Sequence, residues 1–379
     1  MSAEPIAFID LQAQRRRLGA RLDEAVLSAI NEANFILGRQ VAEFERALES
    51  FCGAKHAIGC GNGTDAIALC LMALNLRPGD AVLVPSFTFA STAEVVAWLG
   101  ASPVFVDIED ETYTLDPAGL EQGIAAAKTA NLIPRALISV DLFGQPADYD
   151  PIEAFCAHHG LTLICDAAQG LGASYQGRLV GSVGTFTTTS FFPSKPLGCY
   201  GDGGAILTDD ERHAELLRSL HVHGRGTDKY DNVRIGVNSR LDTLQAAVLL
   251  EKLAVFPEEI AMRDRVAGRY QDGLADVVSV PRIRQRCTSV WAQFTIRVAA
   301  SHRAAIVADL KAKGIPTAIY YPKPLHRQTA YRHYPCAGNG LPVSDRVADE
   351  VLSLPMHPDL DAKTQDVVIA AVRECVSKA

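Results

Sequence analysis

Several common features are missing from this 379-residue sequence. It has no excess of basic residues, because 36 Lys and Arg residues face 44 Asp and Glu residues, for a formal net charge of −8. A net acidic chain is a poor default ligand for nucleic acid or anionic lipid, although a local site can still bind an anionic small molecule. We therefore expect no nucleic-acid partner.

The cysteines lack the spacing of a disulfide or metal framework. There are nine, an odd number, and no two form C-x-x-C. His221 and His223 alternate but have no further ligands nearby in the sequence, so we predict no metal site. The thiols are typical of buried, reduced cysteines in a cytoplasmic protein.

A membrane or export segment is also missing. The N-terminus MSAEPIAFIDLQAQRRR does not follow the basic-then-apolar order of a signal peptide. The longest uncharged stretch, residues 179–194, is too short and too rich in Gly, Ser and Thr to cross a bilayer. These features predict a soluble, cytoplasmic chain with no membrane partner.

Two nucleotide-binding motifs are absent. No G-x-x-x-x-G-K-[ST] occurs, and the glycines at 59, 61 and 63 do not fit G-x-G-x-x-G. A nicotinamide-dependent sugar dehydrogenase or epimerase is therefore a weak alternative, which tight binding of a nicotinamide cofactor would revive.

The composition and the order of elements are those of a globular α/β protein. The chain is 48% hydrophobic and 21% charged, enough for a sizeable core. Short β-rich runs alternate with helical segments from about residue 56 to 210, which predicts a mostly parallel sheet covered by helices.

The pattern changes in the last third of the chain. We predict long helices over residues 241–252 and 260–274, followed by a strand over 290–298, a helix over 302–313 and a strand near 316–321. These elements predict a large domain over residues 1–250 and a smaller α+β domain over 251–379. Residues 1–25 could pack on the smaller domain.

A glycine-rich turn, GCGNGTD at residues 59–65, lies between a predicted strand and a predicted helix. Free amides at a helix N-terminus suit a phosphate, and the hydroxyl of Thr64 adds a donor. The alternative is a tight turn with Thr64 or Asp65 as the helix N-cap.

Asp166 ends the apolar run LTLICD, which reads as a strand. Ligands of open α/β sheets bind at the carboxyl ends of the strands, where an acid can hold a positive charge. The alternative is an N-cap for a following helix. Gln169 is either a capping partner or a group that reaches a ligand oxygen.

Lys195 follows another β-rich run and is enclosed by Pro193, Pro196 and a glycine-rich tail. A desolvated lysine has a lowered pKa and can form a Schiff base with an aldehyde. Ser190 is placed to bind a phosphate. A phosphate cradle, a buried carboxylate and a lysine together are what pyridoxal 5′-phosphate requires, whereas a lysine on a surface loop is the alternative for Lys195 alone.

The combined motifs resemble those of DegT-type nucleotide-sugar aminotransferases. The matching segments are GNGTDAI, PSFTFAST, DLFGQPAD, DAAQGLGA, TTSFFPSKPLGCYGDGGAI and RIGVNSRLDTLQAA. The resemblance runs from FIDL (8–11) to SLPMHP (353–358). It implies an aspartate-aminotransferase-like fold of type I, with a seven-stranded, mostly parallel sheet in the large domain.

The resemblance also implies a role for each matching residue. Lys195 would form the Schiff base and Asp166 would pair with the pyridine nitrogen, as the two catalytic residues. Cofactor binding would involve the ring contacts Gln169 and Phe89, the phosphate contacts Gly63, Thr64 and Ser190, and Asn238 supplied by the partner subunit of a homodimer. The nucleotide-sugar side would be lined by Arg240, Tyr321 and His326.

The substrate follows from the same resemblance. The sequence looks most like the branch that aminates UDP-2-acetamido-2-deoxy-3-keto-glucuronate, with L-glutamate as donor, for bacterial surface polysaccharide such as lipopolysaccharide O-antigen. Aminotransferases for 4-keto-6-deoxy or 3-keto-6-deoxy nucleotide sugars are the alternative. A non-catalytic, cofactor-bound regulator is the alternative from another functional class.

Overall fold

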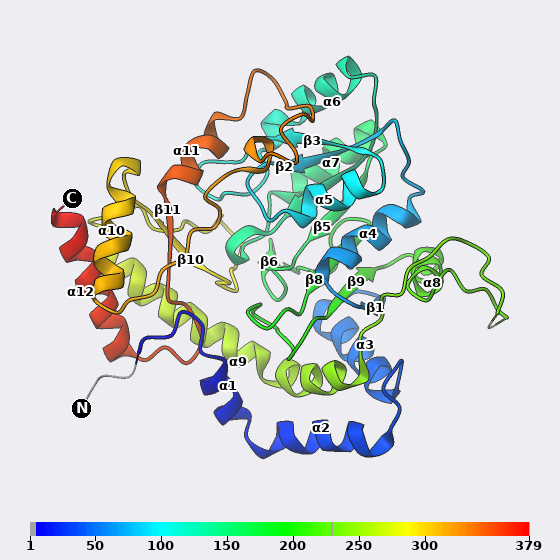
Figure 1. Cartoon of the computed structure of the whole chain (residues 1–379), viewed down its shortest axis with the longest axis horizontal. Coiled ribbons are helices and arrows are strands. Elements are labelled where there is room, and N and C mark those ends of the chain that lie inside the picture. The colour runs from blue at the N-terminus through cyan, green and yellow to red at the C-terminus, as the bar shows by residue number, and fades with distance from the viewer. Residues whose placement is uncertain (1–4, 229, 379) are drawn as a thin grey trace.

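The computed structural model describes residues 5–228 and 230–378 and is built around one central sheet (Figure 1). Its strands are β1 (His56–Cys60), β2 (Asp80–Pro85), β3 (Ser102–Val106), β4 (Ile133–Val140), β5 (Thr162–Asp166), β8 (Phe186–Ser190) and β9 (Gly204–Thr208). They lie in the order β1-β9-β8-β5-β4-β2-β3, and β9 runs antiparallel to both of its neighbours. The predicted seven-stranded, mostly parallel sheet is confirmed.

Most strand residues are buried because helices cover the sheet. Every residue of β2 is buried, and the same holds for β9. The connecting helices are α4 (Gly63–Ala73), α5 (Ser91–Trp98), α6 (Leu120–Thr129), α7 (Tyr149–His159) and α8 (Glu211–Leu220). Continuous apolar runs are expected in a parallel sheet whose two faces are both covered.

The first elements of the chain pack against its later parts. They are α1 (Leu11–Leu18), α2 (Ala20–Glu32) and α3 (Arg39–Cys52). The amide of Met356 donates to Phe8 O at 3.1 Å, and Arg17 forms an ion pair with Asp359 at 2.9 Å. The N-terminal segment therefore contacts the C-terminal third of the chain.

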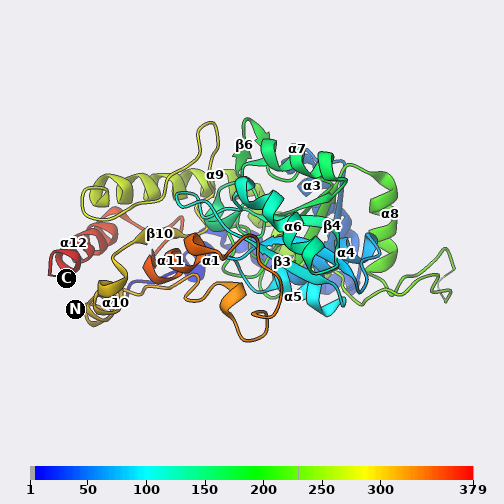
Figure 2. The ribbon, with the colours of Figure 1, turned by 90° about the horizontal axis from the view of Figure 1, so that it is seen from above.

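The C-terminal third forms a second group of elements with its own apolar core. It contains β10 (Phe294–Arg297), which pairs antiparallel with β11 (Val351–Leu354). The helices around this pair are α10 (Ala300–Ala312), α11 (Pro342–Glu350) and α12 (Ala362–Lys378). In both views α10 and α12 lie at one end of the molecule and α8 lies at the opposite end (Figures 1 and 2).

Two predictions about this region are wrong. The two helices predicted over residues 241–252 and 260–274 are one helix, α9 (Thr243–Leu274), which contains Pro257. Pro257 is exposed while Phe256 is fully buried, so packing continues along the inner face although one backbone donor is missing. The strand predicted near 316–321 is a single bridge between Ala318 and Ser353.

The helix α9 joins the two groups of elements. It packs against α2 and α3 near its beginning and against α12 near its end. The domain boundary predicted near residue 250 falls inside this helix. The division of the chain into residues 1–250 and 251–379 stays a prediction.

The remaining short elements lie at the surface or in turns. They are the hairpin of β6 (Ser174–Tyr175) and β7 (Arg178–Leu179), and 3₁₀ turns at Pro117–Gly119, Leu142–Gly144 and Leu325–Arg327.

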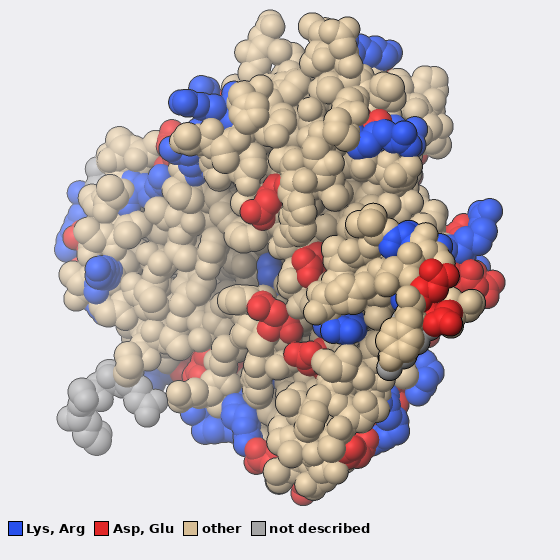
Figure 3. All heavy atoms as spheres, turned by 45° about the vertical axis from the view of Figure 1, so that its right-hand side comes forward, with Lys and Arg blue, Asp and Glu red and all other residues tan. Residues whose placement is uncertain are grey.

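The outer surface carries charges of both signs. On the face drawn in Figure 3, Lys and Arg groups are interspersed with Asp and Glu groups, and uncharged residues cover much of the area. In the part of the chain that the structure describes, no helix combines the length and the apolar character needed to cross a bilayer.

Candidate active site

A cavity of about 690 Å³ lies at the carboxyl-end edge of the central sheet. This is the edge where open α/β sheets bind their ligands, because the loops that follow neighbouring strands meet there. The cavity is lined by Asn62, Gly63, Thr64, Asp65, Thr88, Phe89, Ser91, Val140, Asp166, Ala168, Gln169, Ser190, Phe192, Ser194, Lys195, Asp202, Gln293, Tyr320 and Tyr321.

Asp166 is the last residue of β5 and supplies a buried carboxylate to this cavity. It is 6% exposed, and its Oδ1 accepts a hydrogen bond from the amide of Ala168 at 3.0 Å. Residues 168–172 form turns rather than a helix, so Asp166 is not a helix N-cap.

Lys195 lies in a loop that follows β8 and is held by backbone hydrogen bonds. Its amide donates to Phe192 O at 2.8 Å, and the amide of Cys199 donates to Phe191 O at 2.7 Å. The buried Lys252 of α9 donates to Gly198 O at 2.6 Å and thereby attaches the end of the loop to that helix. Lys195 is therefore a cavity residue on a supported loop, and the alternative of an ordinary surface lysine does not hold.

Burial and charge act in opposite directions on Asp166 and Lys195. Burial raises the pKa of Asp166, while the Ala168 amide and the charge of Lys195 lower it. Burial lowers the pKa of Lys195, and the charge of Asp166 partly offsets that effect. The cavity therefore favours a lysine that gives up its proton more readily than one in water.

The turn that the sequence predicts to be a phosphate cradle lies where α4 begins. Asn62 is the N-cap, because its side chain accepts from the amide of Asp65 at 2.8 Å; Thr64 and Asp65 lie in the first turn. The first helical residue, Gly63, packs so closely that a Cβ there would lie 2.6 Å from Ser190 Cβ. Only a residue without a side chain fits between Ser190 and the helix end, where free amides can bind a phosphate.

Gln169 offers one particular end of its amide to the cavity. Its Oε1 accepts from the amide of Phe143 at 2.7 Å, and its Nε2 lies 3.4 Å from the hydroxyl of Tyr321. Because the oxygen is already engaged, Nε2 is the group available to a ligand oxygen. Gln169 is thus placed as a donor.

Four aromatic side chains line the same cavity: Phe89, Phe192, Tyr320 and Tyr321. The ring of Phe89 is 55% exposed, and its centroid lies 6.3 Å from that of Tyr321. An exposed ring at a cavity wall can stack on a flat ligand.

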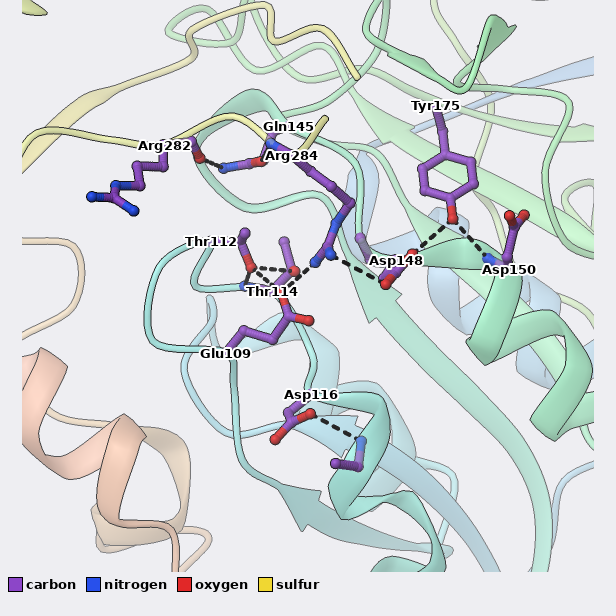
Figure 4. A network of polar contacts seen from close by, with 12 residues as sticks. Glu109, Thr112, Thr114, Asp116, Gln145, Asp148, Asp150, Tyr175, Arg282 and Arg284 are labelled. Carbon is purple, nitrogen blue, oxygen red and sulfur yellow. Dashed lines mark hydrogen bonds and ion pairs between the residues drawn. The ribbon is translucent and has the colours of Figure 1, made fainter. Parts of the chain in front are cut away.

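A segment far along the chain, residues 282–293, reaches the cavity through the loop that follows β4. The side chain of Gln145 donates to Arg282 O at 2.9 Å and accepts from the amide of Arg284 at 3.2 Å (Figure 4). The guanidinium of Arg284 in turn contacts Glu109 and Asp148. These contacts hold the segment that carries Gln293 against the edge of the sheet.

Three predicted residues lie outside the set that lines the cavity. Asn238 is exposed and forms a bridge with Val222, while Arg240 is partly buried two residues further on. His326 lies between Ser86 and Asp345, with its Nδ1 2.6 Å from Ser86 Oγ and its Nε2 3.2 Å from Asp345 Oδ1. Their predicted contacts with cofactor or substrate stay predictions.

The sequence reading missed several cavity residues. Asp202 and Thr88 lie inside the motifs quoted above, and Tyr320 directly precedes the predicted Tyr321, so their position next to matched residues was a usable signal. The signal at Gln293 was weaker, because it is a single amide side chain within the apolar run VWAQFTI.

A larger groove of about 850 Å³ lies elsewhere, lined in part by Tyr113, Arg297 and His302. Arg297 already pairs with Asp110 at 2.7 Å and with Glu350 at 2.5 Å, so its charge is engaged within the protein. Within residues 5–228 and 230–378, no group of three or more His, Cys, Asp or Glu side chains is placed to hold a metal ion.

The residues of the cavity fit pyridoxal phosphate. The close approach of Gly63 to Ser190 brings the free amides of α4 and the Ser190 hydroxyl together, which suits the phosphate. The buried acid Asp166 suits the ring nitrogen, the amine of Lys195 suits the aldehyde, and the Nε2 of Gln169 suits the ring oxygen.

Comparisons with known proteins agree with this site. A model described as the DegT/DnrJ/EryC1/StrS aminotransferase family matches residues 17–373. A Pseudomonas aeruginosa protein named UDP-2-acetamido-2-deoxy-3-oxo-D-glucuronate aminotransferase is 47% identical over 368 residues, covering 97% of this chain and 99% of the relative.

Solved structures are similar over the whole chain. The crystal structure of a DegT DnrJ EryC1 StrS aminotransferase from Brucella abortus matches with a TM-score of 0.96 and 51% identity, covering 97% of this chain and 99% of the other. A protein of S. venezuelae, solved in complex with a ketimine intermediate, matches with a TM-score of 0.93 and 37% identity over 100% of both chains.

We expect Gly63→Ala to weaken the binding of pyridoxal phosphate. The added methyl group would overlap Ser190, and overpacking of this kind costs about 1–3 kcal/mol, or roughly 5- to 150-fold in Kd. Spectroscopic titration of the cofactor-free protein measures this. The matched control is Gly268→Ala in α9, where a Cβ has no neighbour within 4 Å, and its Kd should not change. Equal affinities in the two variants would contradict the cradle.

We expect Asp166→Asn to move the pH dependence of cofactor capture to lower pH. The charge of Asp166 raises the pKa of Lys195, so its loss lowers that pKa further and leaves more neutral amine at a given pH. The rate at which the cofactor-free protein develops visible absorbance with pyridoxal phosphate, recorded against pH, gives the midpoint. The control is Asp202→Asn. Asp202 is a cavity carboxylate that is not among the causes of the Lys195 pKa shift, so the pH midpoint of this variant should equal that of the native protein. A shift to higher pH in Asp166→Asn would contradict the pairing.

Proposed function

Because this chain belongs to the DegT/DnrJ/EryC1/StrS aminotransferase family, we propose that it transfers an amino group to UDP-2-acetamido-2-deoxy-3-keto-glucuronate. The observation that carries the proposal is the joint placement of Lys195, Asp166 and the Gly63–Ser190 cradle around one cavity, in a chain 47% identical to the Pseudomonas aeruginosa enzyme. L-glutamate is the proposed amino donor, and bacterial surface polysaccharide is the proposed destination of the product.

Pyridoxal 5′-phosphate is the cofactor, and when bound it supplies a ring that withdraws electrons from the substrate carbon. The protein contributes binding and proton movement. The carboxylate of Asp166 keeps the ring nitrogen protonated, and the amides and hydroxyls of Gly63, Thr64 and Ser190 hold the phosphate. Phe89 stacks on the ring, and Gln169 donates to the ring oxygen.

Lys195 has two tasks in this proposal. Its Nζ first holds the cofactor covalently, and after release it moves a proton at the substrate carbon. Both tasks need a neutral amine near neutral pH, and burial lowers the pKa of this lysine as required. Buried charges such as those of Asp166 and Lys195 also interact more strongly than charges at the surface, because protein screens them less than bulk water does.

The partner proposed for this enzyme is a second copy of the same chain. The segment between α8 and α9 projects from the body of the molecule (Figures 1 and 2) and contains Asn238. Val233 and Ile235 on this segment are 53% and 88% exposed, and the consecutive Phe35, Ile36 and Leu37 are each at least 40% exposed; groups of exposed apolar side chains mark interaction surfaces. We propose that Asn238 reaches the phosphate site of the partner subunit.

The proposed enzyme works in the cytoplasm. The nine cysteines, all within the described residues, are free thiols, as expected in a reducing compartment.

The substrate proposal is tested with the amine form of the cofactor bound to the enzyme. We expect UDP-2-acetamido-2-deoxy-3-keto-glucuronate to restore the visible absorbance of the lysine-bound cofactor faster than other UDP-, dTDP- and GDP-linked keto-sugars. Lys195→Ala should lose this absorbance and turnover, whereas Lys55→Ala, which changes an exposed lysine, should keep both. Preference for a 4-keto-6-deoxy sugar would overturn the substrate assignment.

The shared site is tested by mixing two inactive variants. In a dimer of one Lys195→Ala chain and one Asn238→Asp chain, one of the two sites has both native residues if Asn238 acts across the interface. Random exchange of subunits should then restore about a quarter of the native activity. No recovery after exchange, checked by separating tagged hybrid dimers, would show that Asn238 does not act in this way.

A further inference from the structure

Gln293 brings an unused amide to the cavity from the C-terminal third of the chain. It lines the cavity together with Lys195 and Asp166. Its Oε1 is buried and has no hydrogen-bond partner among the described residues. A buried acceptor without a partner is unfavourable unless a ligand supplies the missing hydrogen.

The position of Gln293 is fixed by the loop after β4. The backbone N–H of Gln293 donates to Phe143 O at 3.4 Å, and the backbone N–H of Val290 donates to Gly144 O at 3.0 Å. A Cβ on Gly144 would lie 2.7 Å from the amide nitrogen of Trp291, so the two backbones touch. The backbone N–H of Phe143 also donates to Gln169 Oε1, so the loop after β4 positions both Gln169 and Gln293.

The polar contacts of Gln145 and Arg284 in Figure 4 support the same segment. Gln145 holds the backbone of Arg282 and Arg284 about ten residues before Gln293, and Arg284 is anchored by Glu109 and Asp148. The amide of Gln293 is therefore presented by a braced backbone, which limits the entropy lost when it binds a ligand.

The chemistry of an amide narrows the choice of ligand. The unpartnered oxygen requires an N–H or O–H donor, which a carboxylate or phosphate does not offer. The other end of the amide, Nε2, is a donor that requires an acceptor. A trans secondary amide, such as an acetamido group, can give its N–H to Oε1, while its carbonyl points the other way and leaves Nε2 to a different acceptor.

We propose that Gln293 determines specificity by binding the 2-acetamido group of the sugar. The acetamido N–H would donate to the unpartnered Oε1. In the substrate proposed above this group is on C2, next to the C3 carbon that receives the amine, so it lies near Lys195 during the reaction. The inference rests on the proposed function and adds a residue that recognises one substituent of the substrate, the 2-acetamido group.

The test compares two substrates in two enzymes. We expect Gln293→Leu to lower kcat/KM for UDP-2-acetamido-2-deoxy-3-keto-glucuronate about tenfold, and to leave kcat/KM nearly unchanged for the analogue that has only hydrogen on C2 and therefore no donor for Oε1. The half-reaction with L-glutamate, followed by the loss of visible absorbance, should proceed at the native rate because no acetamido group is involved.

A nearby variant controls for effects on packing. Thr295→Val removes the buried hydrogen bond between Thr295 and Ser353 at 2.9 Å, two residues further along the chain. It should lower thermal stability without changing the ratio of kcat/KM for the two substrates. Gln293→Met, a second apolar replacement of similar length, should reproduce the loss of selectivity if Gln293→Leu folds poorly.

The outcomes separate the two proposals. Equal losses on both substrates in Gln293→Leu, or a slower half-reaction with glutamate, would overturn the role of Gln293 and leave the proposed function intact. A native enzyme that does not aminate the 2-acetamido substrate at all would overturn both.

Discussion

The attraction between Asp166 and Lys195 inside one poorly solvated cavity is the interaction on which the site depends. Burial favours the neutral form of each group, because it raises the pKa of the acid and lowers that of the amine. Each charge partly offsets this effect on the other. A bound cofactor changes this balance, because the acid then faces a ring nitrogen and the amine joins an aldehyde.

The sheet determines where this pair can form. Asp166 ends β5 and Ser190 ends β8, and these neighbouring parallel strands deliver their last residues to the same edge. The turn before α4 comes to that edge from β1, which is separated from β8 by β9. The supporting contacts, such as Lys252 on the Gly198 carbonyl, come from α9. The reactive side chains thus lie on loops or at strand ends, and the strands and helices behind them hold them in position.

The loop after β4 connects the cofactor side of the cavity with the C-terminal third of the chain. Asp141 begins this loop, with Oδ1 accepting from the amide of Ala147 at 3.0 Å and from the hydroxyl of Tyr149. The carboxyl group of Asp141 and the hydrogen bonds to it are buried, and this burial raises the pKa of Asp141 to about 7. Phe143 and Gln145 on the same loop then hold Gln169 on one side and the segment before Gln293 on the other.

The sequence by itself determined the parts of the site whose signals are local. The strand that ends in Asp166, the glycine that opens α4 and the lysine after β8 each follow from a short pattern, since a strand end or helix start is set by neighbouring residues. Tertiary structure alone decided that Gln293, more than 120 residues beyond Asp166, faces the same cavity. It also decided that α9 continues through Pro257 and that His326 lies between Ser86 and Asp345. These features depend on packing between distant segments, whose free energy no local pattern records.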